Sequence, residues 1–262
     1  MTPSMQYRAN SESPSVEDYL VSIYRLLIDK KKVNTGELAQ KMGVSAASTS
    51  AMFKRLQNRG LINYNPYEGV DLTANGKEIA LHVLRRHRII ERFLTDTLNI
   101  GWERVDNLAH QMEHALPEEV LDRLDQWLGE PETCPHGHPI PLADGKIKDQ
   151  SGTTIDKLRQ GQKATVLSVA EDNPKLLQYL KECGLVPGTV FELSNKNSID
   201  GTMQIKIGAE EQFIGPRIVS AVSVLPYRIK GSRLLLSDLG FPLFCNSSTL
   251  ACSASIRSMI CR

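Results

Sequence analysis

The spacing of apolar residues predicts three short helices near the start of the chain. Between residues 15 and 29, apolar positions recur every three or four residues, which is typical of a helix with one buried face. A second helix is expected over 35–42 and a third over 45–59, with Ser15, Thr35 and Ser45 as their N-caps. Gly43 permits the tight turn between the second helix and the third.

Two short strands are predicted next, over 61–64 and 70–72, with the turn-forming residues 65–69 between them. Helix, short helix, turn, helix and hairpin is the order of a winged helix-turn-helix. In such a unit the helix after the turn enters the DNA major groove, so that role falls to residues 45–59.

The pattern beyond the hairpin divides the rest of the chain. Helices are expected over 73–99, which is amphipathic and basic in its middle, and over 102–116 and 117–128; a Pro- and Gly-rich stretch, 129–152, follows. Strands over 164–169, 189–193 and 202–207, with a helix over 174–182 among them, indicate a small β-rich module. The fold class is therefore mainly α with a β-rich end.

Composition narrows the class of protein. The chain has 262 residues, 41% of them hydrophobic, and a net charge of +1, so any DNA-binding surface must be a local basic patch. No apolar run reaches the roughly 18 residues of a membrane span, and the polar N-terminus does not resemble a secretory signal. Five cysteines without regular spacing do not suggest a disulfide framework, and we expect a cytoplasmic protein.

The outward face of the 45–59 helix has the chemistry of a DNA-reading surface. Small side chains permit close approach, Ser hydroxyls can contact bases or phosphates, and Ala can touch a thymine methyl group. The helix starts without Arg, Asn or Gln, which favours recognition of DNA shape. The alternative is an ordinary solvated helix face. The candidate DNA-binding residues are Ser45, Ala47, Ser48, Ser50, Ala51, Lys54, Arg55, Arg59 and, in the hairpin, Tyr64.

The sharpest chemical signal is His110-x-x-Glu113-His114. These three residues are spaced i, i+3 and i+4, so they share one face of a helix and can chelate a divalent ion. Asp106 lies one turn earlier on the same face. His87 and Glu91 form another i, i+4 pair, although in isolation they are better interpreted as a solvated pair.

Two other interpretations stay open for these residues. His-x-x-Glu-His is also the inverted zinc-peptidase motif, in which the Glu between the two His ligands is the general base. A metal-independent DNA-binding or scaffold protein would instead bind DNA equally well with chelator. The segment Cys134-Pro135-His136-Gly137-His138 is interpreted as a rigid loop with incidental His, because no paired CxxC accompanies it.

Taken together, these motifs resemble the diphtheria toxin repressor family of iron- and manganese-responsive regulators, in its three-domain form. The resemblance is good over 15–141, weaker over 161–226, and absent from the tail. It is carried by Val16-Glu17-Asp18-Tyr19-Leu20 with Ile23-Tyr24, by residues 44–60, by Leu72-Thr73 with Gly76, by Arg86-His87-Arg88 with Glu91-Arg92-Phe93-Leu94, by Glu113-His114, and by Pro139-Ile140-Pro141.

The resemblance implies a DNA-binding domain over 1–75, a helical metal-binding and dimerisation domain over 76–141, a linker over 142–157 and an SH3-like domain over 158–230. No role is assigned to the tail, 231–262. It also implies two metal positions: a primary one formed by Asp18, His110, Glu113 and His114, and an ancillary one formed by His87 and Glu91 with Asp106. Iron-type members carry Met at Asp18 and Cys at His110, and manganese-type members carry Glu at His110 and at Val21, so this chain matches neither type.

The ligands so implied are carboxylates and imidazoles, which suit Mn(II) first and Fe(II) next, and also Zn(II). The expected protein is therefore not an enzyme but a homodimeric repressor of metal-ion homeostasis, with double-stranded operator DNA as its partner and no small organic substrate. An ion bound by Asp18 and by the next domain would set the angle of the DNA-reading unit. The helices over 73–99 and 102–128 are expected to supply the dimer interface.

Overall fold

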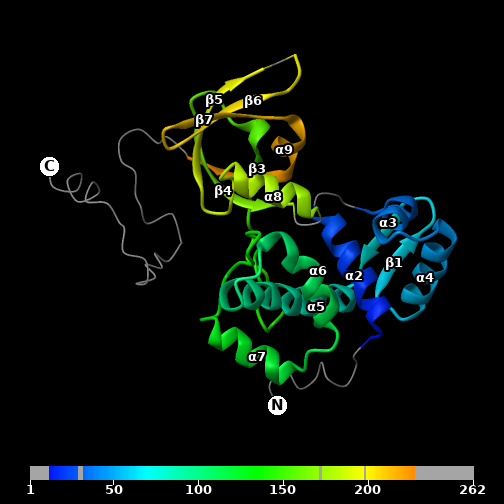
Figure 1. Cartoon of the computed structure of the whole chain (residues 1–262). Coiled ribbons are helices and arrows are strands. Elements are labelled where there is room, and N and C mark those ends of the chain that lie inside the picture. The colour runs from blue at the N-terminus through cyan, green and yellow to red at the C-terminus, as the bar shows by residue number, and fades with distance from the viewer. Residues whose placement is uncertain (1–11, 29–31, 171–172, 198, 228–262) are drawn as a thin grey trace. The chain divides into compact units, whose positions relative to one another are not determined.

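The computed structural model describes residues 12–28, 32–170, 173–197 and 199–227 (Figure 1). The predicted tail, 231–262, lies outside the described residues. The mainly helical first part and the β-sheet module that follows confirm the predicted fold class.

A winged helix-turn-helix forms the first part of the chain. Its elements are α2 (Pro14–Leu27), α3 (Thr35–Met42), α4 (Ala46–Asn58) and an antiparallel hairpin of β1 (Ile62–Asn65) and β2 (Gly69–Leu72). One apolar cluster joins these elements, and its fully buried members include Leu20, Ile23, Phe53 and Leu56.

The starts of these helices differ in detail from the prediction. The first helix begins at Pro14, with Ser13 rather than Ser15 at its N-cap. Asn34, not Thr35, caps α3: its side chain accepts from the Glu37 backbone amide, and the Glu37 side chain accepts from the Asn34 amide, a capping box. Ser45 does cap α4, as predicted, by accepting from the Ser48 amide.

The helical middle of the chain consists of α5 (Ala74–Arg92), a π-helical turn η2 (Phe93–Thr97), α6 (Trp102–Glu113) and α7 (Glu118–Trp127). Helix α5 packs against α2, α6 and α7. The basic stretch of α5 is not a solvated face, because Arg85, Arg86 and Arg88 are all less than 9% exposed. Arg85 donates to the carbonyl of Pro141 at 2.7 Å, and Arg88 donates to that of Pro139, so both hold the segment after α7.

The last module is a six-stranded antiparallel sheet in the order β3-β8-β4-β5-β6-β7. Its strands are β3 (Thr153–Thr154), β4 (Lys163–Val169), β5 (Val190–Lys196), β6 (Met203–Ile207), β7 (Glu210–Ile214) and β8 (Val222–Pro226); its helices are η3 (Ile155–Lys157), α8 (Pro174–Glu182) and α9 (Pro216–Ala221). The sequence did not reveal β3, β7, β8 or α9. Strand β3 has only two residues, and β7 begins with two exposed glutamates, so neither has a clear alternation of apolar and polar positions.

The helical region and the sheet module share a contact through Trp102. This first residue of α6 is 7% exposed and belongs to the same apolar cluster as the core of the sheet. Its ring stacks on that of His136, with centroids 5.5 Å apart and planes 28° apart. The helices in the described part of the chain are too short or too polar to span a bilayer.

Candidate metal centre

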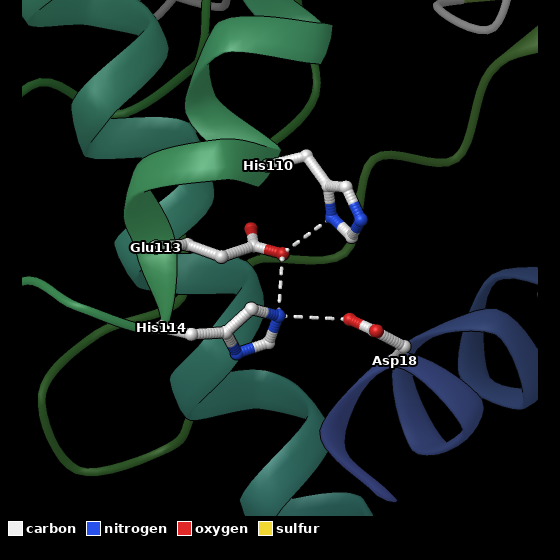
Figure 2. A group of neighbouring side chains, drawn as sticks. All are labelled: Asp18, His110, Glu113 and His114. Atoms are coloured by element: carbon white, nitrogen blue, oxygen red, sulfur yellow. Dashed lines mark hydrogen bonds and ion pairs between the residues drawn. The ribbon is translucent and has the colours of Figure 1, made fainter. Parts of the chain in front are cut away.

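The last turn of α6 and the first half of α2 bring four potential ligands together. His110, Glu113 and His114 lie on α6 or at its C-cap, and Asp18 comes from α2 (Figure 2). One ligand atom from each lies within 4.8 Å of the others. Asp18 Oδ1 is 2.8 Å from His114 Nε2, and Glu113 Oε1 is 2.8 Å from His110 Nδ1 and 3.4 Å from His114 Nε2. We call these four residues the primary cluster.

Glu113 also connects this cluster to a second one. Its other oxygen, Oε2, is 2.6 Å from His87 Nδ1, while His87 Nε2 is 3.2 Å from Asp106 Oδ1 and 3.6 Å from Glu91 Oε1. His87, Glu91 and Asp106 form the ancillary cluster. Interpreting His87 and Glu91 as a solvated pair was wrong, because their exposed fractions are 4% and 0%.

A third cluster joins Glu91 to the segment after α7. Cys134 and His136 are buried, and each offers a ligand atom close to Glu91. From the sequence alone, this segment is predicted to be a rigid loop with incidental His. Its Cys-x-His spacing was the available signal, but the third member, Glu91, lies more than 40 residues away and becomes its neighbour only on folding.

The hydrogen bonds of His136 suit metal ligation. Its Nε2 lies 2.8 Å from the carbonyl oxygen of Trp102, and since a carbonyl only accepts, Nε2 must carry the proton. In the neutral ring, Nδ1 then presents its lone pair to Glu91 Oε1, 3.1 Å away. Two lone pairs at that distance repel each other, so this pair needs either a proton, which makes it an ion pair, or a bound cation between the two atoms.

Charge in the two other clusters also favours a bound cation. Burial by itself would lower the pKa of His87, but the charge of Glu91 and hydrogen bonds to Asp106 and Glu113 raise that pKa well above its usual range. Hydrogen bonds to Asp18 and then to Glu17 raise the pKa of His114 to about 9. Burial would raise the pKa of Glu91, but His87 and His136 hold it well below its usual range. The carboxylates thus create a strongly cation-favouring environment where a divalent ion would bind.

A cavity of about 260 Å³ opens beside the primary cluster. Its lining includes Asp18, His87, Asp106, His110 and Glu113, together with Val21 from α2. As stated above, manganese-type members of the family that this chain resembles carry Glu at the position of Val21. Here Val21 offers no ligand atom, so the carboxylates that line the cavity come from Asp18 on α2 and from Asp106 and Glu113 on α6.

The predicted DNA-reading face of α4 is largely accessible. Of its candidate residues, Ser45, Ala47, Ser48, Ala51, Lys54, Arg55 and Arg59 are exposed, and Ser50 is half-buried. Ser45 has a local role besides, because its hydroxyl oxygen caps the helix. Arg59 forms an ion pair with Glu12 just before α2, so that pair must open or rearrange if Arg59 is to reach a phosphate.

Tyr64 is less suited to DNA contact than the sequence suggested. It is half-buried, and its ring packs against Phe53 with centroids 4.8 Å apart. The exposed aromatic residue of the hairpin is Tyr67 at its turn, with 97% of its surface accessible.

Comparison with known proteins gives three domain matches along the chain. Residues 13–70 match the iron dependent repressor N-terminal DNA binding domain, and residues 73–142 match the iron dependent repressor metal binding and dimerisation domain. Residues 153–226 match the FeoA domain.

Individual relatives agree with these matches. The chain is 32% identical to the diphtheria toxin repressor of Corynebacterium jeikeium over 202 residues, which cover 68% of this chain and 84% of that protein. It is 29% identical to the iron-dependent repressor IdeR of Mycobacterium leprae, over 66% of this chain and 80% of the relative. A solved manganese-dependent transcriptional repressor in complex with manganese superposes with a TM-score of 0.77 at 30% identity, covering 81% of this chain and all of the other. A structure of ScaR with bound Cd²⁺ superposes with a TM-score of 0.70 at 28% identity, over 80% of this chain and 98% of the other.

Proposed function

Because this chain belongs to the diphtheria toxin repressor family of metal-dependent, DNA-binding transcription repressors, we propose that it represses metal-uptake genes in response to Mn(II). The observation that carries this proposal is the primary cluster, in which Asp18 of the DNA-binding region and the end of α6 offer ligands within 4.8 Å of one another. We propose that the repressor acts in the cytoplasm as a homodimer.

The ligand chemistry supports Mn(II), with Fe(II) next. The primary and ancillary clusters contain only carboxylates and imidazoles, which suit these ions, and Zn(II) fits the same donors. Of the three clusters found among the described residues, the third alone contains a thiol, that of Cys134. Because affinity among such ions follows the intrinsic order of the metals, the tightest ion in solution need not be the physiological one.

The chain's own residues account for the coupling between metal and DNA. When bound, a divalent ion supplies positive charge that carboxylates from two regions can share. Asp18 lies on α2, within the winged helix-turn-helix, and His110, Glu113 and His114 lie on α6, so common ligation restricts the angle between them. In a dimer that angle sets the separation of the two α4 helices, which must match half-sites about one helical turn apart. Metal and DNA then strengthen each other's binding by the same factor.

An enzymatic role for His110, Glu113 and His114 is disfavoured by the surroundings of Glu113. A general base needs a carboxylate oxygen free to accept a proton from water. Glu113 is 4% exposed, and its two oxygens face His110 and His87. That arrangement supports a role as ligand rather than base.

The decisive test is binding to DNA from upstream of the chain's own gene, followed by fluorescence anisotropy. The full chain is titrated with chelator, with Mn(II), with Fe(II) under anaerobic conditions, and with Zn(II). Binding that requires metal and is lost in Asp18→Ala, but kept in the surface control Asp96→Ala, is the expected result. Equal binding with chelator would leave a constitutive DNA-binding protein and contradict the proposal.

A further inference from the structure

The ring of His114 lies between two neighbouring carboxylates of α2. Its Nε2 is 2.8 Å from Asp18 Oδ1, and its Nδ1 is 2.8 Å from Glu17 Oε2. Asp18 borders the cavity, whereas Glu17 is 3% exposed and faces the interior. The two consecutive residues therefore hold opposite edges of one imidazole.

The two edges cannot serve the same ion, because the nitrogens of an imidazole ring point in divergent directions. Nε2 faces the primary cluster, with Glu113 Oε1 3.4 Å away, so it is the nitrogen available to the ion that Asp18 would share. Nδ1 then carries the proton and donates it to Glu17. A ligating histidine whose other N–H is held by a carboxylate has a defined tautomer and ring orientation, and its ligating nitrogen is more basic.

We propose that Glu17 is a positioning residue of the primary cluster: by accepting the Nδ1–H of His114, it directs Nε2 toward the ion. This inference rests on the proposed metal-binding function. It adds a residue that is outside the ligand set and that belongs to the DNA-binding region, so α2 would control both what His114 binds and how it is oriented.

Arg86 of α5 keeps Glu17 in place. Its guanidinium lies 3.4 Å from both carboxylate oxygens of Glu17 and 3.4 Å from the backbone carbonyl of Glu113. The Glu17–His114 distance is shorter, at 2.8 Å. A carboxylate buried to this degree needs compensating partners, and Arg86 and His114 supply them from two different helices.

The first test measures Mn(II) affinity in the full chain without DNA, by electron paramagnetic resonance of the free ion. Asp18→Ala identifies the binding step that belongs to the primary cluster. We expect Glu17→Ala to weaken that step by roughly 10- to 100-fold with unchanged stoichiometry. Glu17→Gln should recover most of the affinity, because its amide oxygen still accepts from Nδ1–H. If Gln is as weak as Ala, Glu17 acts through its charge alone and the positioning role is overturned.

A matched control separates positioning from general damage. Asp125→Ala removes the carboxylate partner of Arg85, a similarly buried pair between α5 and α7 whose side chains are 8% and 13% exposed. We expect it to lower thermal stability while the primary Mn(II) step stays unchanged. Weakening of that step by Asp125→Ala as large as that by Glu17→Ala would overturn the proposal.

A second measurement does not depend on how any variant folds. Long-range ¹H–¹⁵N spectra of the unmodified chain loaded with Cd(II) report which nitrogen of His114 binds metal. Coordination through Nε2 with a protonated Nδ1 is expected, and coordination through Nδ1 overturns the proposal. If the unmodified chain binds neither Mn(II) nor Cd(II) at this cluster, the proposed function fails as well. Equal affinity in Glu17→Ala and the unmodified chain overturns only the role of Glu17.

Discussion

Replacing Trp102 with Ala tests whether α6 and the sheet module form one packed unit. Trp102 belongs to α6 by sequence, but it is a member of the apolar cluster that forms the core of the sheet module, and α6 packs against α8 of that module. It also stacks on His136, the residue that approaches Glu91. Truncation should therefore destabilise the sheet module and loosen its contact with α6.

The size of the effect follows from the burial of the indole. A buried aromatic side chain removes about 150–250 Å² from water, and at about 25 cal/mol per Å² this gives about 4–6 kcal/mol as an upper bound. Residual compactness of the unfolded chain lowers that value by roughly 10–40%. With Trp102 only 7% exposed, we expect Trp102→Ala to lower the free energy of unfolding by about 3–4 kcal/mol.

Trp102→Phe is the informative comparison. Within the described part of the chain, the buried indole Nε1 has no hydrogen-bond partner. Burying an unpaired N–H costs about 1–3 kcal/mol, so its removal offsets the cavity left by the smaller ring. The Phe variant should therefore lie within about 1 kcal/mol of the parent.

Urea unfolding in chelator measures both variants, and amide hydrogen exchange locates the change. Faster exchange should appear in β4 and α8 of Trp102→Ala, with α2, α3 and α4 unaffected. A loss below about 1 kcal/mol, or faster exchange confined to the winged helix-turn-helix, would refute the packing argument.

Three further predictions concern local features. Gly137→Ala places a Cβ 1.9 Å from a backbone carbonyl of β4, at a residue whose φ is +87°. It should therefore lower stability in urea by more than Gly145→Ala, because Gly145 has a similar φ of +77° but a Cβ there meets nothing within 4 Å. Equal losses in the two variants would contradict this prediction. Hydrogen bonds to the α2 carboxylates raise the pKa of His114 to about 9. In chelator, the stabilisation from these bonds should therefore be complete below about pH 6.5 and disappear as the pH rises through about 9. A free energy of unfolding that instead increases between these pH values would show that His114 does not form these bonds. Asn34→Ala removes a capping box and should reduce stability by about 1 kcal/mol in thermal unfolding, whereas no change would mean that solvent caps α3 equally well.

Local sequence alone determined the winged helix-turn-helix and the ligand face of α6. Apolar periodicity and capping residues act over a few positions, so they predicted the helices to within two or three residues at most ends. The spacing of His110, Glu113 and His114 placed them together because a helix brings i, i+3 and i+4 to one face whatever surrounds it. Asp18 was added only through resemblance to a family, since nothing local to α2 indicates a ligand.

Tertiary structure decided everything that joins distant segments. Nothing in the local sequence distinguishes Glu17 from other helix residues, because its partner His114 lies 97 residues further along the chain. Cys134 and His136 become neighbours of Glu91, and Arg85 and Arg88 of α5 meet the carbonyls of Pro141 and Pro139, only when the segment after α7 packs against that helix. The physical reason is the same in each case. A charged group can be buried only beside a partner that compensates its lost hydration, and which partner this is depends on the packing of whole helices rather than on the sequence nearby.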